Sequence, residues 1–97
     1  MSVCTFIRKQ LKTKGKTEHT GRGCYWMRRD CSWDELKERV EKKLVEWNEK
    51  GIVESSEMTE EKIQVVFTKE FHNGYYRCFY ANRQWDNMMG VSMVCDF

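Results

Sequence analysis

The clearest repeating pattern of apolar and polar positions lies in residues 32–50. Apolar side chains recur there at intervals of three or four residues, which places them on one face of a helix. Ser32 is suited to the N-cap, Glu35 completes a capping box with it, and Gly51 is suited to end the helix. The pattern predicts a long amphipathic helix. Its buried stripe consists of Trp33, Leu36, Val40, Leu44 and Trp47.

A second pattern, in which apolar and polar residues alternate, covers residues 62–84 and predicts two paired strands. The Asn73-Gly74 dipeptide between them is the preferred sequence of a two-residue hairpin turn. Such a turn pairs Phe67 with Tyr80, and it decides which side chains face the helix. The predicted inward set is Ile63, Val65, Phe67, Phe71, Tyr76, Cys78 and Tyr80.

The opposite face of this hairpin is mixed in character and contains a predicted Glu70–Arg77 cross-strand pair. Its members are Gln64, Val66, Thr68, Glu70, His72, Tyr75, Arg77, Phe79, Ala81 and Arg83. Tyr75, Arg77, Phe79 and Arg83 are the candidate binding residues of this outer face. Three interpretations stay open: the four residues stack and pair with nucleotides, they contact a protein, or another segment covers them.

The remaining segments predict shorter elements. Residues 23–29 alternate as a strand does, and residues 90–97 predict a third strand beside the hairpin. Residues 3–11 fit either a strand or a helix, and their β-branched content favours a strand. Residues 12–23 are rich in Gly, Thr and Lys and predict a mobile basic loop.

These elements predict a single α+β domain over residues 1–97. It consists of an antiparallel sheet in ββαβββ order with one long helix packed on one face. One of Tyr25 and Trp26 then faces the helix, and the other lies near the surface. A variant with a further helix near Trp85 stays open.

Charge is unevenly distributed, although the net charge is only +2. Residues 1–29 contain eight basic side chains and one acidic, whereas residues 30–62 contain eleven acidic and six basic. The basic third is a candidate contact for a polyanion or another partner. Its members are Arg8, Lys9, Lys12, Lys14, Lys16, Arg22, Arg28 and Arg29. The alternative is that the two oppositely charged segments neutralise each other or are only solvated.

The five cysteines are scattered and odd in number, which predicts reduced thiols. A zinc site would require His19, Cys24, Cys31 and either His72 or Cys4. Their spacing is not typical of zinc ligands, so neither a metal nor another cofactor is predicted. No apolar run approaches the ~18 residues of a membrane span, and no secretory signal is evident. We therefore expect a cytoplasmic, reducing location.

The sequence contains no motif of a catalytic nucleophile, phosphate-binding loop or metalloprotease, so an enzyme is not expected. The favoured hypothesis is a small protein-binding regulator or inhibitor of the compact type that viruses and phages encode. Its partner is a protein, with a nucleic-acid-handling protein as one candidate. Pairing of two copies through a sheet edge is a further option. The alternative function is direct binding of RNA or DNA by the basic third.

Overall fold

The computed structural model of the chain describes residues 3–19, 24–71, 76–85 and 88–92. The described residues form a small α+β domain, which confirms the predicted fold class. In chain order the elements are α1 (Val3–Leu11), β1 (Lys14–His19), β2 (Cys24–Arg28), α2 (Trp33–Glu49), β3 (Val53–Met58), β4 (Lys62–Phe67), β5 (Cys78–Asn82) and β6 (Met88–Ser92).

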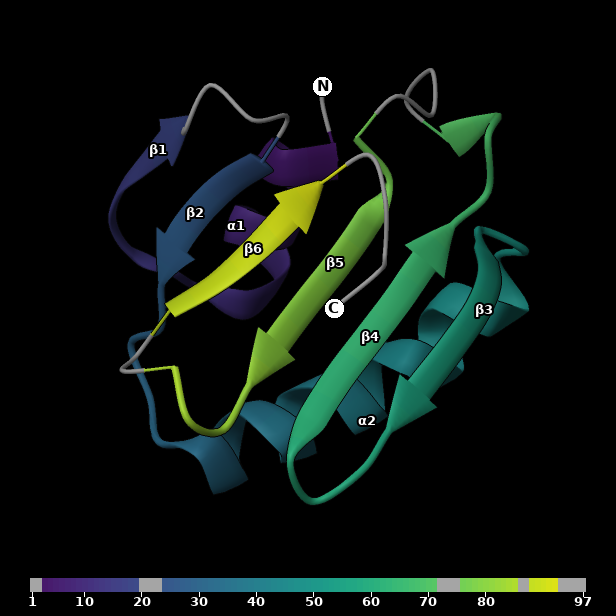
Figure 1. Cartoon of the computed structure of the whole chain (residues 1–97). Helices are drawn as coiled ribbons and strands as arrows, with labels where there is room; N and C mark the ends of the chain where they lie inside the picture. The colour runs from purple at the N-terminus through teal and green to yellow at the C-terminus, as the bar shows by residue number, and fades with distance from the viewer. Residues whose placement is uncertain (1–2, 20–23, 72–75, 86–87, 93–97) are drawn as a thin grey trace.

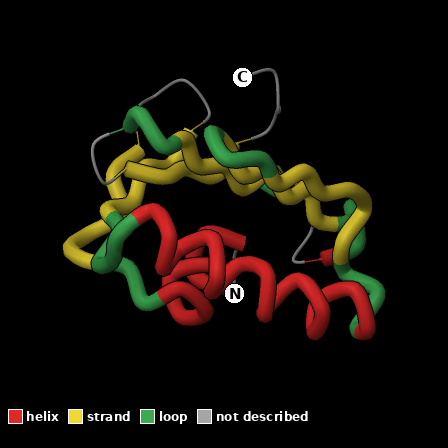
Figure 2. Tube along the Cα trace, turned by 90° about the horizontal axis from the view of Figure 1, so that it is seen from below, coloured by secondary structure: helices red, strands yellow, loops and turns green. Residues whose placement is uncertain are grey.

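The strands form one antiparallel sheet in the order β1-β2-β6-β5-β4-β3 (Figure 1). Strand β6 lies between β2 and β5, so the N-terminal hairpin extends the meander formed by β3 to β6. Both helices pack against the same face of the sheet (Figure 2). The hydrophobic core lies between these two layers, and the other sheet face carries a separate, smaller cluster.

Helix α2 agrees closely with the sequence prediction. The backbone N–H of Glu35 donates to the side-chain oxygen of Ser32 at 3.3 Å, which forms the predicted N-cap. Gly51 has a φ of 70°, the left-handed conformation that follows many helix ends. The buried stripe comprises Trp33, Leu36, Val40 and Trp47, and Leu44 packs partly buried against the same core.

The strand prediction for residues 3–11 is wrong, because these residues form helix α1. Its buried side chains are Val3, Cys4, Ile7 and Leu11, a spacing that fits one face of a helix. The stripe completes the core beside α2. Burial of a continuous helical face therefore outweighs the modest strand preference of β-branched residues, which depends strongly on context.

Two further strands occur where no strand was predicted. Residues 14–19 form β1, so the prediction of a basic loop is wrong for them, while residues 20–23 lie outside the described residues. Residues 53–58 form β3, which pairs with β4. Both are edge strands, and each has a register irregularity in its pairing. An edge strand with one paired side is compatible with polar composition, which explains why the apolar pattern did not reveal them.

The pairing of β4 with β5 differs from the register that the Asn-Gly turn predicts. Tyr80 pairs with Gln64 rather than with Phe67, a shift of three positions along β4. Because side chains alternate between faces, an odd shift turns β5 over. The turn itself, residues 73 and 74, lies outside the described residues.

The reversed strand exchanges the predicted faces of β5. Phe79 and Ala81 point into the core beneath the sheet, whereas Cys78 and Tyr80 lie on the opposite face. The predicted Glu70–Arg77 pair is replaced, since Nη1 of Arg77 contacts Oε2 of Glu54 at 3.0 Å.

Strand β4 keeps its predicted orientation. Ile63, Val65 and Phe67 are buried in the core, and Val66 lies with the cluster on the opposite face. The sheet face that carries this second cluster is called the outer face below.

Candidate functional site

The basic residues proposed from the sequence do not form one continuous surface. Arg8, Lys9 and Lys12 are exposed on α1 and just beyond its end, in the helical layer. Arg28 is also exposed, but it belongs to β2. It lies two residues after Trp26, so both side chains lie on the outer face. The sheet therefore separates Arg28 from the cations of α1.

Arg29 is not a surface cation, and its assignment to a polyanion contact is wrong. Its side chain is only 7% exposed. Nη2 donates to the backbone oxygen of Trp85 at 3.1 Å, and the guanidinium lies 5.4 Å from the ring centroid of Trp33. Arg29 thus connects the β5–β6 segment to the start of α2, a role in stability rather than in binding.

The side chains of four other predicted residues lie outside the described part of the structure. Lys14 and Lys16 lie within β1, where only their backbone is described, and Arg22 lies outside the described residues. Tyr75, from the predicted outer patch, also lies outside them.

The predicted outer patch of the hairpin does not form as expected. Phe79 is completely buried in the core, so its assignment to the surface is wrong. Arg77 is engaged with Glu54 and also donates to the backbone oxygen of Phe67. Arg83 is exposed, in the turn that follows β5. The predicted patch fails to form because the pairing of β4 with β5 is shifted by an odd number of residues, which exchanges the two faces of β5.

The outer face instead carries an aromatic cluster, defined here as Trp26, Tyr80 and Trp85. The ring centroids of Tyr80 and Trp85 are 5.1 Å apart, those of Trp26 and Trp85 are 5.4 Å apart, and those of Trp26 and Tyr80 are 5.8 Å apart. All three pairs meet edge to face, which is a favourable arrangement of aromatic rings. The two indoles are partly exposed, while Tyr80 is buried between them.

Gly90 makes this packing sterically feasible. It lies on β6 opposite both Trp26 and Tyr80. A β-carbon at this position would come within 3.0 Å of Cζ and Oη of Tyr80. The ring of Tyr80 therefore covers the glycine, a close approach that a larger residue would prevent.

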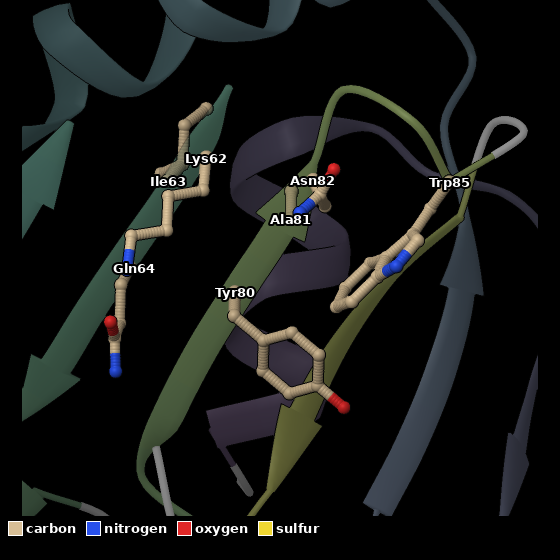
Figure 3. A pocket seen from close by; sticks show the side chains of 7 residues that line it. All are labelled: Lys62, Ile63, Gln64, Tyr80, Ala81, Asn82 and Trp85. Carbon is tan, nitrogen blue, oxygen red and sulfur yellow. The ribbon is translucent and has the colours of Figure 1, made fainter. Parts of the chain in front are cut away.

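A shallow hollow of about 70 Å³ lies beside the aromatic cluster, between β4, β5 and the β5–β6 turn. Figure 3 shows the Trp85 indole next to the ring of Tyr80, with Gln64 on the neighbouring strand. Lys62 and Asn82 also line the hollow. Pockets that enclose small ligands are roughly 300–1,000 Å³, so this hollow has room for part of one side chain rather than for a substrate.

The sequence predicted only part of this site. It predicted that one of Tyr25 and Trp26 faces outward, and the structure assigns that position to Trp26, since Tyr25 packs against the core. Tyr80 was assigned to the inward face because of the predicted register. Trp85 follows β5 in a turn, and no local pattern indicated that its ring returns over the sheet.

Among the described cysteines, Cys31 is partly buried beside charged side chains. Burial raises the pKa of the Cys31 thiol, and the nearby Asp30 and Glu35 also raise it, while Arg39 opposes them. Cys4 and Cys31 are free thiols, so the prediction of reduced cysteines holds for these two. It does not hold for Cys78, which is disulfide-bonded. Within the described residues, no group of three His, Cys, Asp or Glu side chains could hold a metal ion.

Comparison of the chain with protein-family models, curated proteins and solved structures finds no significant match. In the described part of the chain, none of the helices has the length and apolar character needed to cross a membrane. The function is therefore inferred from the geometry of the surface itself.

Proposed function

We propose that this chain is a non-enzymatic protein-binding module, of the small regulator or inhibitor type, which contacts its partner through the outer face. One observation carries the proposal: the aromatic cluster lies on the outer face. This is the sheet face against which neither helix packs (Figure 2). Among the described residues, neither a helix nor a strand covers it. Partly exposed aromatic rings fixed on a rigid sheet are typical anchors of protein interfaces.

The geometry of the rings favours a protein over a stacked nucleic-acid base. A base needs an open ring face, but the three rings meet edge to face, and Tyr80 is only 3% exposed. The edges of Trp26 and Trp85 and the hollow beside them suit an inserted aliphatic or aromatic side chain. Gln64 and Asn82 supply amides at the rim for hydrogen bonds.

The charges around the cluster indicate the chemistry of the partner. Arg28 is exposed on one side, and Lys62 lies on the other. Lys62 is paired with Glu57, but at 3.7 Å and partly exposed, so the pair is weak. The surface therefore fits an apolar side chain surrounded by carboxylates. A nucleic-acid-handling partner would present such a surface away from its own basic groove.

The edges of the sheet argue against pairing with a second copy. Both edge strands, β1 and β3, have a register irregularity and are rich in charged residues. Glu54 and Glu57 on β3 are themselves in ion pairs. Charged side chains and irregular pairing on edge strands are among the ways in which proteins prevent edge-to-edge association. We therefore expect a monomer that binds a different protein.

The test begins with affinity capture from the native host lysate after nuclease treatment, and continues with the purified partner. Calorimetry should give a stoichiometric complex with the wild type. Trp85→Ala should weaken it by about 30-fold or more, the effect of removing an interface hot spot. Arg28→Glu should weaken it mainly at low salt.

Two controls make the result specific to the outer face. Val45→Ala truncates an apolar side chain that is 62% exposed on α2, in the helical layer, and Lys69→Glu reverses an exposed charge in the turn after β4. Neither should change the affinity. A purified partner that binds Trp85→Ala as tightly as the wild type, with the variant shown to be folded, would exclude the outer face.

A further inference from the structure

A second concave surface lies in the helical layer, independent of the outer face. It is a hollow of about 380 Å³ between the end of α1 and the middle of α2, called the basic hollow here. Its lining residues are Lys9, Gln10, Lys12, Arg39, Lys42 and Lys43. Five of the six are cations, although α2 as a whole belongs to the acidic part of the sequence.

Arg39 holds the two sides of the hollow together. Its Nη1 contacts Oδ1 of Asp30 at 2.7 Å and donates to the backbone oxygen of Leu11 at 3.2 Å. The second bond satisfies a carbonyl at the C-terminal end of α1, where helix carbonyls otherwise lack partners. The hydrogen bond with Asp30 also raises the pKa of Arg39. Because it ties α2 to the end of α1, Arg39 fixes Lys9 and Lys12 opposite Lys42 and Lys43.

The four lysines are available to an anion. Lys9 and Lys12 are exposed, and no carboxylate of the described residues forms an ion pair with either. Lys42 is paired with Glu38 at 3.1 Å and Lys43 with Glu46 at 3.7 Å, both on the helix surface. Exposed pairs of this type contribute little, roughly 0–1 kcal/mol, so a multivalent anion can displace them.

We propose that the basic hollow binds the phosphate backbone of a nucleic acid without reading its sequence. The lining decides between this occupant and an acidic protein segment. Protein interfaces depend on a desolvated apolar centre, and none of the six lining residues is apolar. Non-specific nucleic-acid binding needs only cations that neutralise phosphates and release counterions. The lining also lacks an aromatic ring for base stacking, so binding does not require unpaired bases.

The hollow combines residues that the sequence keeps apart. Lys9 and Lys12 come from the basic third, whereas Lys42 and Lys43 come from a helix whose overall charge is acidic. Only the packing of α1 as a helix against α2 unites them. The proposed site therefore depends on the element for which the sequence favoured a strand.

The test is fluorescence anisotropy with the purified full chain and a labelled mixed-sequence DNA duplex of about 20 base pairs, titrated over a range of salt concentrations. The variant is the double neutralisation Lys9→Gln/Lys12→Gln. We expect it to reduce affinity about tenfold at ~0.1 M salt and to lower the salt slope by about two, since each lost phosphate contact removes about 0.9. The matched control, Lys69→Gln/Arg83→Gln, removes the same charge at two exposed positions outside the hollow.

Three results would overturn the proposal. The first is absence of binding by the wild type at low salt. The second is a double variant that behaves like its control. The third is competition by tripolyphosphate or by polyglutamate as efficient as that by unlabelled DNA at equal charge, which would assign the hollow to a small phosphate ligand or to an acidic protein.

A measurement on the wild type avoids any dependence on the folding of variants. Amide chemical shifts recorded during titration with the same DNA should change at residues 9–12 and 39–43. Changes confined to the outer face, around Trp26 and Trp85, would contradict the assignment. Because the two surfaces are tested with different partners and different variants, either proposal can fail while the other stands.

Discussion

The two faces of the sheet use similar side chains for different purposes. On the helix-covered face, Phe67 and Phe79 are completely buried under α1 and α2. On the outer face, Tyr80 is buried only by its aromatic neighbours Trp26 and Trp85, whose rings stay partly exposed. Apolar surface on the helix-covered face is buried on folding, whereas part of the apolar surface on the outer face remains available to a partner. Burial alone therefore does not show which aromatic residues stabilise the fold and which can also bind.

The largest effect that separates the two faces is expected for Phe79→Ala. The side chain has no exposed surface, so its removal should lower the free energy of unfolding by about 3–5 kcal/mol, measured by urea denaturation. If Phe79→Ala does not fold, Phe79→Leu should still lose about 1–2 kcal/mol. The control Val45→Ala should stay within about 0.5 kcal/mol. A loss below ~1 kcal/mol for Phe79→Ala would indicate the register that the Asn-Gly turn predicts.

A smaller effect is expected where the two layers are joined by Arg29. Substitution Arg29→Met keeps the volume but removes the bond to the Trp85 carbonyl and the contact with Trp33. We expect a loss of about 2 kcal/mol, since a carbonyl loses its charged donor. The adjacent Arg28→Met is the control, because Arg28 is exposed, and it should change stability by less than about 0.5 kcal/mol. Equal effects of the two would mean that Arg29 is a surface residue.

How much of this organisation the sequence could reveal depends on how local the determining interactions are. Helix α2 is specified by its own cap, stripe and end, so residues Ser32 to Gly51 predict it correctly. The strand β4 is likewise correct, because its alternation is strong. Helix α1 was not predicted from the sequence. Its nine residues include β-branched side chains, and they form a helix only because their buried face packs against α2 and the sheet.

The candidate site was harder to predict because it depends on pairing between distant strands. The pairing of β4 with β5 decides whether Phe79 or Tyr80 faces outward. The observed pairing is shifted by three positions from the one that a two-residue Asn-Gly turn predicts. The aromatic cluster also requires β6 to bring Gly90 between Trp26 and Tyr80. The basic hollow requires the packing of α1 against α2. None of these relations is encoded in a short window of sequence.

The outer face can be tested through Gly90. In Gly90→Ala the new methyl group would meet the ring of Tyr80 at 3.0 Å and the backbone oxygen of Tyr25 at 3.3 Å. We expect a loss of about 1–2 kcal/mol in the free energy of unfolding and a changed near-ultraviolet dichroism of the cluster. In a Tyr80→Ala background the same substitution should cost much less, since the ring is absent. Additive losses would show that Tyr80 does not cover Gly90.

The smallest expected effect concerns an ion pair at the end of the helical layer and should depend on pH. Lys37 Nζ lies 2.9 Å from Oε1 of Glu60, and this hydrogen bond, followed by the positive charge itself, lowers the pKa of Glu60. A carboxyl group whose pKa is lower in the folded state stabilises the fold above its unfolded pKa and loses that contribution as pH falls through the folded pKa. Glu60→Gln should therefore lower the urea midpoint slightly at neutral pH and not at all at the acidic end of the titration. Glu61→Gln, an exposed neighbour, should change neither. A Glu60→Gln deficit that persists undiminished in acid would mean that the Glu60 side chain does not contribute through its charge. The bond from the Trp33 indole N–H to the backbone oxygen of residue 60, at 3.0 Å, is present in both proteins and cancels in the comparison.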